Sequence, residues 1–255
     1  MPDNPARPLR DRVALVTGAD QALGRGLAVA LGRAGADIGL LGGDLDSMEG
    51  AAVDVADAGA RVARFAVAYG SRAEVEAVFS EADRALGAVD IVVHAAVDPI
   101  AVEPVALVDV DEDRWEAVWE GMMWSSLLSC QAAFTQMAGR GGRIIFSTPT
   151  LSMSGAAGLV PYTAAVEGQR LLAKSAARQW GSHGITVNCV APAAATGEGD
   201  EAGGRHHLPL NPAPLGRPGD PETDLGPVVV FLASDGGHFV TGATICVDGG
   251  VWMAP

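Results

Sequence analysis

The chain has 255 residues, of which 49% are hydrophobic and 19% charged, and its formal net charge at pH 7 is −14. This composition predicts a folded core, and the acidic balance excludes the basic surface that a nucleic-acid-binding protein needs. No apolar run reaches the roughly 18 residues of a membrane-spanning helix, so we expect no membrane partner.

Apolar, strand-like runs alternate with helical patterns along the whole chain. The first ten residues are polar and proline-rich and predict a disordered arm (1–10) before a single domain (11–255). The predicted strands lie at 12–18, 36–41, 60–67, 89–96, 142–148, 184–192 and 242–250. The predicted helices lie at 22–34, 44–58, 71–86, 111–138, 162–181 and 221–234. This alternation predicts an α/β fold: a Rossmann-like, doubly wound, seven-stranded parallel sheet with helices on both faces.

Two further features concern the loops and the cysteines. Residues 196–222 are rich in Gly, Pro and acidic residues, and they follow the carboxyl end of the sixth strand, where such sheets bind ligands; this predicts a mobile, lid-like loop. Cys130, Cys189 and Cys246 lie far apart in apolar stretches, without the spacing of metal ligands or of a disulfide framework. We therefore expect core cysteines, no metal site and a cytoplasmic protein.

Several motifs together resemble the short-chain dehydrogenase/reductase family over nearly the whole chain. They are VALVTGADQALGRGLA, GAVDIVVHAA, YTAA, HGITVNCVAP, LGRPGDPE and VTGATICVDGG. The resemblance implies a chain that binds NAD or NADP, assembles as a tetramer and carries an Asn-Ser-Tyr-Lys catalytic tetrad. A shared fold does not guarantee a shared function, so the activity depends on the residues at the individual family positions.

The phosphate-binding loop matches the family pattern T-G-x-x-x-G-x-G only in part. Thr17, Gly18 and Gly24 match, but Ala22 stands in place of the middle glycine, and its Cβ occupies space that the pyrophosphate needs. Asp20 adds a carboxylate that repels phosphate. We interpret the three matching residues as vestigial and expect this chain to bind no cofactor, while intact dinucleotide binding remains the alternative.

The other nucleotide-contacting positions are also changed. The ribose-selecting position falls on Gly42 and Gly43, and Asp44 is better explained as a helix N-cap than as a ribose ligand. The adenine-contacting Asp of the family falls on Ala68, and His94 stands where the family has Asn. We expect His94 to be a packed, hydrogen-bonded residue.

Of the tetrad, only Tyr162 is kept. Met122, Pro149 and Val166 replace the Asn, Ser and Lys. Tyrosine has a pKa near 10 and needs a cationic neighbour to act as a base near neutrality. Lys174, the only lysine, lies about 18 Å further along the helix axis. We assign no catalytic residue and predict that the conventional hydride-transfer site is absent.

The favoured hypothesis is a non-catalytic subunit that pairs with an active paralogue of the same family in a heterotetramer-like, NAD-dependent hydroxyacyl-CoA or alcohol dehydrogenase. NAD is expected in the partner, and the contact is expected through helices 111–138 and 162–181 and the C-terminal tail. Heteromeric members with one degenerate subunit act in bacterial degradation of aromatic compounds. The benzylsuccinate-pathway 2-[hydroxy(phenyl)methyl]succinyl-CoA dehydrogenase is similar in this respect.

Two alternatives remain open. The chain could be an enzyme of another kind, in which Tyr162, His94 or Glu167 transfers protons in the emptied cofactor pocket; Glu167 is then expected to raise the pKa of Tyr162. It could instead be a small-molecule-binding regulator that uses the same cleft and moves the loop at 196–222.

Overall fold

The computed structural model describes residues 7–193 and 213–253. Seven parallel strands form one sheet in the order β3-β2-β1-β4-β5-β6-β7, which confirms the predicted architecture. The strands are β1 (Val13–Thr17), β2 (Asp37–Gly42), β3 (Val62–Ala66), β4 (Ile91–His94), β5 (Gly142–Ser147), β6 (Ile185–Ala191) and β7 (Thr244–Cys246). The strand order reverses between β1 and β4, and open sheets of this kind bind ligands beside the carboxyl ends of such a pair.

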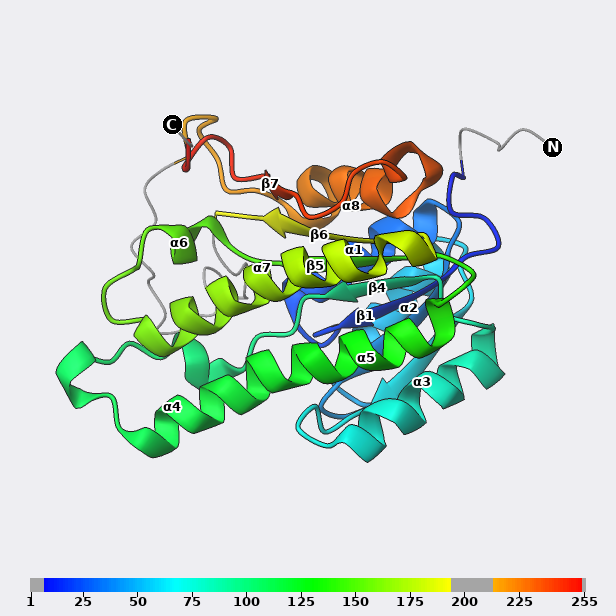
Figure 1. The fold of residues 1–255 in the computed structure, drawn as a ribbon. Coiled ribbons are helices and arrows are strands. Elements are labelled where there is room, and N and C mark those ends of the chain that lie inside the picture. Colours follow the sequence, from blue (N-terminus) through cyan, green and yellow to red (C-terminus); the bar gives the residue numbers. More distant parts are fainter. Residues whose placement is uncertain (1–6, 194–212, 254–255) are drawn as a thin grey trace.

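Helices cover both faces of the sheet (Figure 1). One core cluster joins the sheet to α1 (Ala22–Arg33), α2 (Glu49–Asp57) and α8 (Gly226–Ala233). A second cluster joins the opposite face to α3 (Arg72–Leu86), α5 (Ser125–Met137) and α7 (Val160–Trp180). The remaining α-helices, α4 (Glu112–Trp119) and α6 (Thr150–Met153), lie beyond the carboxyl ends of the central strands.

The predicted helix 111–138 is a composite of three helical pieces. Asp111 caps α4 by accepting a hydrogen bond from the backbone N–H of Arg114 at 2.8 Å. A π-helical turn, η3 (Glu120–Trp124), then joins α4 to α5. A π turn places residues five apart above one another. Trp119 and Trp124 therefore stay on the same side of the helix.

The ends of several predicted segments differ from the structure. Residues 7–10 were expected in a disordered arm, but they form a turn in which Leu9 is fully buried and donates its N–H to the Ala34 carbonyl at 3.0 Å. The predicted helix 44–58 begins only at Glu49. Most of the predicted lid, 196–222, lies outside the described residues, and its end at 221–222 already belongs to the helical turn η5 (Pro221–Leu225).

Within 7–193 and 213–253, no helix is long and apolar enough to cross a membrane. The same residues contain no group of three or more His, Cys, Asp or Glu side chains placed to hold a metal ion. Cys130 and Cys189 are buried as predicted, whereas Cys246 is exposed because it ends the edge strand β7.

Candidate functional site

In the loop between β1 and α1, the three residues that match the family pattern have structural roles of their own. The Thr17 hydroxyl oxygen accepts hydrogen bonds from the backbone N–H groups of Ala95 and Ala96, at 3.0 and 3.1 Å, and so ties β1 to the end of β4. Gly18 has φ +68°, and a Cβ there would lie 2.6 Å from the Cα of Ala96. A Cβ on Gly24 would lie 2.2 Å from the Gly18 carbonyl oxygen. These residues are therefore required by close packing whether or not a nucleotide binds.

Polar groups at the mouth of this loop are already paired within the chain. The Gln21 side-chain amide donates to the Val97 carbonyl at 2.7 Å, and its oxygen accepts from the Val97 N–H at 3.2 Å. The N–H of Gly18 donates to the Tyr69 hydroxyl at 3.4 Å. Burial raises the pKa of Tyr69, so its hydroxyl stays protonated. Tyr69 was not singled out from the sequence, because an aromatic residue after a strand has no distinctive spacing.

A groove of about 470 Å³, here called the acidic groove, extends from this loop along the carboxyl ends of the strands. Three carboxylates line it, from Asp20, Asp98 and Glu120, and none of its lining residues is basic. The Asp98 carboxylate also caps a short helical turn by accepting from the Ile100 N–H at 3.0 Å. The groove therefore has the wrong charge for a pyrophosphate.

The ribose-selecting positions also carry no ligand-like side chain. Gly42 ends β2, and Gly43 lines the groove. The Asp44 carboxylate accepts from the Ser47 N–H at 2.9 Å, and this contact lowers its pKa. The predicted helix N-cap at Asp44 is therefore wrong: Asp44 caps a turn, and α2 begins only at Glu49 after Met48. Ala68 is exposed and has no side-chain group that could bind adenine.

Three of the four tetrad positions meet in one small apolar cluster. Met122, Tyr162 and Val166 are each at most 2% exposed. The cluster, here called the Tyr162 cluster, consists of Ala101, Val118, Met122, Leu159, Tyr162, Ala165 and Val166. Pro149, at the fourth position, is buried beside the start of α6. The fold thus brings three of the four tetrad positions together in hydrophobic contact.

Tyr162 is poorly suited to proton transfer in this cluster. Its side chain is fully buried, and its hydroxyl has no hydrogen-bond partner among the described residues. Burial raises its pKa above the ordinary value of tyrosine, because the phenolate would lose its hydration. Lys174 is exposed further along α7 and gives it no cationic neighbour.

His94 belongs to a separate buried chain of polar residues. Its ring stacks on Phe146, with centroids 5.5 Å apart, and its Nε2 lies 3.3 Å from the hydroxyl oxygen of Ser126. Ser126 donates to the Met122 carbonyl at 2.6 Å and accepts from the Gln169 amide at 2.8 Å. Burial lowers the pKa of His94 to about 4, so the ring is neutral at pH 7. The expected packed, hydrogen-bonded histidine is confirmed.

Glu167 faces a cation and not the tyrosine. Its carboxylate pairs with the nearly buried guanidinium of Arg170 at 3.0 Å and accepts from the Ser152 hydroxyl at 2.6 Å. Arg170 also donates to the Thr148 carbonyl at 3.1 Å. The expected effect of Glu167 on the pKa of Tyr162 is therefore wrong, because burial alone raises that pKa. Tyr162, His94 and Glu167 make separate contacts, and none of them lines the acidic groove.

A parallel sheet in this strand order, with a glycine turn after β1, defines a dinucleotide-binding type of Rossmann domain. The family model described as Enoyl-(Acyl carrier protein) reductase matches residues 18–252. The chain belongs to the short-chain dehydrogenase/reductase family.

Its similarity to known oxidoreductases extends over almost the full length. It is 35% identical to the 3-oxoacyl-[acyl-carrier-protein] reductase FabG of Pseudomonas aeruginosa, over 96% of this chain and 99% of that one. It is 31% identical to a 2-dehydro-3-deoxy-D-gluconate 5-dehydrogenase of Pseudoalteromonas atlantica, over 96% of this chain and 97% of that one. A crystal structure of a dehydrogenase/reductase from Sinorhizobium meliloti 1021 superposes with a TM-score of 0.88 at 27% identity, covering 97% of this chain and 98% of the other.

Proposed function

We propose that this chain is a non-catalytic subunit that assembles with an active short-chain dehydrogenase paralogue in an NAD-dependent hydroxyacyl-CoA or alcohol dehydrogenase. The observation that carries the proposal is the Tyr162 cluster. Met122 and Val166 offer no polar atom in their side chains, and burial raises the pKa of Tyr162. A tyrosine in these surroundings cannot exchange a proton with a substrate near neutrality. The chain keeps the frame of a reductase without its acid–base chemistry.

The residues of the acidic groove do not fit a nicotinamide dinucleotide. The N–H of Gly18 is taken by Tyr69, and the groove is lined by Asp20, Asp98 and Glu120. A phosphate charge about 6 Å from a carboxylate is destabilised by roughly 1–3 kcal/mol at a partly shielded surface. Three such groups without a balancing cation disfavour the cofactor. In this proposal NAD is held by the partner subunit.

An exposed aromatic surface supports assembly. Trp115, Trp119 and Trp124 are 39%, 44% and 39% exposed. Together with Glu116 and Glu120 they line an open hollow of about 570 Å³, here called the tryptophan face. Trp115 and Trp119 stack with centroids 6.5 Å apart. Clustered, solvent-facing tryptophans of this kind are typical of protein–protein interfaces.

The charge of the tryptophan face favours an unlike partner. In a symmetric dimer each residue near the two-fold axis meets its own copy, so Glu116 and Glu120 would approach identical carboxylates. Like charges across an interface oppose association. A paralogue with basic residues at the matching positions avoids this repulsion. The guanidinium of Arg72 lies 5.9 Å from the Trp124 ring centroid, a contact of the type that such a partner could add.

Co-expression with a paralogue that carries the complete tetrad tests the proposal. We expect the lone chain to give no saturable NADH fluorescence signal and no turnover, and the two chains to co-elute as one active oligomer in size-exclusion chromatography. Replacing Trp119 by Ala should weaken the complex by about 2 kcal/mol or more if it is a central contact. Leu45→Ala, at another exposed apolar residue, is the matched control. A lone chain that binds NADH with micromolar affinity and reduces a ketone contradicts the proposal.

A further inference from the structure

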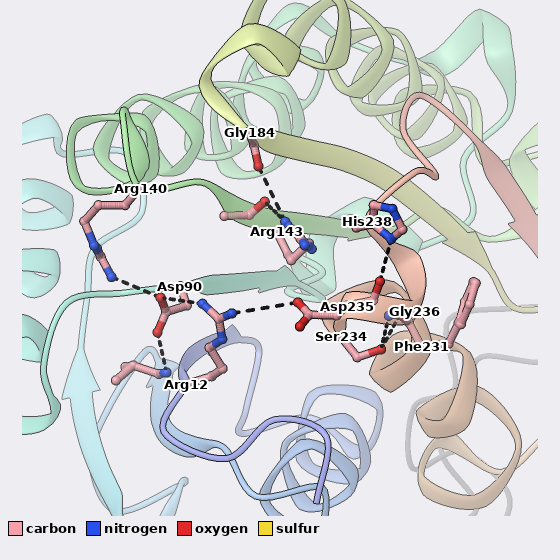
Figure 2. A network of polar contacts seen from close by, with 12 residues as sticks. Arg12, Asp90, Arg140, Arg143, Gly184, Phe231, Ser234, Asp235, Gly236 and His238 are labelled. Carbon is pink, nitrogen blue, oxygen red and sulfur yellow. Dashed lines mark hydrogen bonds and ion pairs between the residues drawn. The ribbon is translucent and has the colours of Figure 1, made fainter. Parts of the chain in front are cut away.

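A second pocket lies at the amino ends of the strands, whereas the acidic groove lies at their carboxyl ends. Its volume is about 340 Å³, and it is bordered by the residues that begin β4 and β5 and by Gly184, just before β6. Three arginines line it: Arg12 from just before β1, Arg140 from the α5–β5 loop and Arg143 from β5 (Figure 2). No residue lines both this pocket and the acidic groove. The arginine pocket, as it is called below, is thus a separate site.

The one carboxylate that lines the arginine pocket is already saturated. Asp90 accepts from the Val13 N–H at 3.0 Å, from Arg12 at 3.4 Å and from Arg140 at 3.0 Å. Asp235 lies outside the lining; it contacts Arg12 at 3.9 Å, and its charge also acts on Arg143. Three guanidinium groups therefore lie near two carboxylates, of which only Asp90 lines the pocket, and this leaves a local excess of positive charge in a chain whose net charge is −14.

Arg143 has donors that the protein does not use. Its Nη1 donates to the carbonyls of Gly142 and Gly184, at 3.0 and 3.5 Å, which fixes the side chain. Its buried Nε has no hydrogen-bond partner among the described residues, and no described carboxylate forms an ion pair with it. Burial, and then the charge of Arg12, lower the pKa of Arg143, and the charge of Asp235 opposes this in part. Burial is thus the main influence on this guanidinium.

Glycines make the wall between the arginines. The lining includes Gly139, Gly141, Gly142 and Gly184, so backbone rather than side chains borders this part of the pocket. The two loops meet closely, because a Cβ on Gly141 would lie 3.0 Å from the Gly184 carbonyl oxygen. Gly141 and Gly184 both have positive φ, at 80° and 74°. This backbone arrangement leaves room for a ligand beside Arg140 and Arg143.

We propose that the arginine pocket binds a phosphate group, either as inorganic phosphate or as part of a small phosphate monoester. A guanidinium presents a planar fork of donors that matches two oxygens of a phosphate, and contacts of this charge-assisted kind are strong. Arg143 supplies a guanidinium that has no ion-pair partner among the described residues, and Arg12 and Arg140 supply further positive charge. The volume of about 340 Å³ lies within the range of small-molecule sites and exceeds the needs of a single ion. This site is independent of the proposed function.

Isothermal titration of the full chain at low ionic strength tests the proposal, with inorganic phosphate in one arm and glycerol 3-phosphate in the other. The acidic surface repels anions in general, so saturable binding reports a specific site. We expect one site per chain. Tighter binding of the ester than of inorganic phosphate identifies a monoester as the ligand, and equal binding identifies the free anion. Arg143→Gln should weaken binding roughly tenfold or more, as the loss of a charge-assisted hydrogen bond predicts.

Two further variants keep the test decisive. Arg178→Gln, at an exposed arginine of α7, makes the same change in net charge and should leave the affinity unchanged. Arg143→Lys keeps the charge without the fork and should bind between the wild type and Arg143→Gln. The proposal is overturned if neither compound binds at about 10 mM, or if Arg178→Gln weakens binding as much as Arg143→Gln does in folded protein.

Discussion

Replacing Tyr162 by phenylalanine removes only the hydroxyl group from the middle of the Tyr162 cluster. That oxygen is buried and has no hydrogen-bond partner among the described residues. An unsatisfied buried hydroxyl costs about 1–3 kcal/mol, so Tyr162→Phe should increase the free energy of unfolding by about 1–2 kcal/mol. For a domain of this size, the midpoint of thermal unfolding should rise by roughly 2–4 °C per kcal/mol. In an active reductase the same change would remove the proton donor.

The chain offers a matched control, because its only other tyrosine does make a hydrogen bond. Tyr69→Phe removes the acceptor of the Gly18 N–H and should lower the free energy of unfolding by about 1 kcal/mol. Urea unfolding followed by circular dichroism measures both variants, with an unchanged m-value as the check on the denatured state. The reasoning is refuted if Tyr162→Phe is destabilised by more than about 1 kcal/mol while Tyr69→Phe is unaffected.

Three more changes test other parts of the structure. The pKa of His94 is lowered to about 4, so the unfolded state binds a proton first as the pH falls. The free energy of unfolding should therefore decrease between about pH 6.5 and 4, by up to about 3 kcal/mol. His94→Asn should remove that part of the pH dependence, as measured by urea titrations. Gly18→Ala should lower the free energy of unfolding by about 2 kcal/mol or more, because φ is positive there and the new Cβ would lie 2.6 Å from Ala96. Gly43→Ala should leave it nearly unchanged, because a Cβ there would meet no atom within 4 Å. Equal losses for the two variants in thermal unfolding would contradict this. Val166→Lys should restore no NADH oxidation and should destabilise the chain by about 2–4 kcal/mol, a cost that shrinks as the pH rises toward 10 because a lysine buried there has a lowered pKa.

Local pattern was sufficient to predict the sheet. Buried parallel strands need apolar runs, and the crossovers between them need amphipathic helices, so the alternation along the chain left few arrangements for strands such as β1 and β4. The local pattern predicted the ends of the ordered segments less well. Leu9 is one apolar residue in a polar stretch, and its burial and its hydrogen bond to Ala34 at the end of α1 are contacts that the local pattern does not predict.

Some features of the candidate site can likewise be predicted from the sequence, and others depend on the tertiary structure. The sequence alone shows that no lysine follows Tyr162 by one turn and that Pro149 has no hydroxyl. Spacing along a helix and a side chain's chemical type are local properties, and they suffice to predict the loss of the tetrad.

The tertiary structure determined the surroundings of the residues that stand at the tetrad positions. That Met122 and Val166 close around Tyr162, that Ser152 donates to Glu167, and that Tyr69 reaches Gly18 all depend on contacts between separate segments of the chain. The arginine pocket has the same origin, because its three guanidinium groups come from separate elements that meet at one edge of the sheet. Side-chain direction and burial set the pKa of each group, and neither can be read from residue order alone.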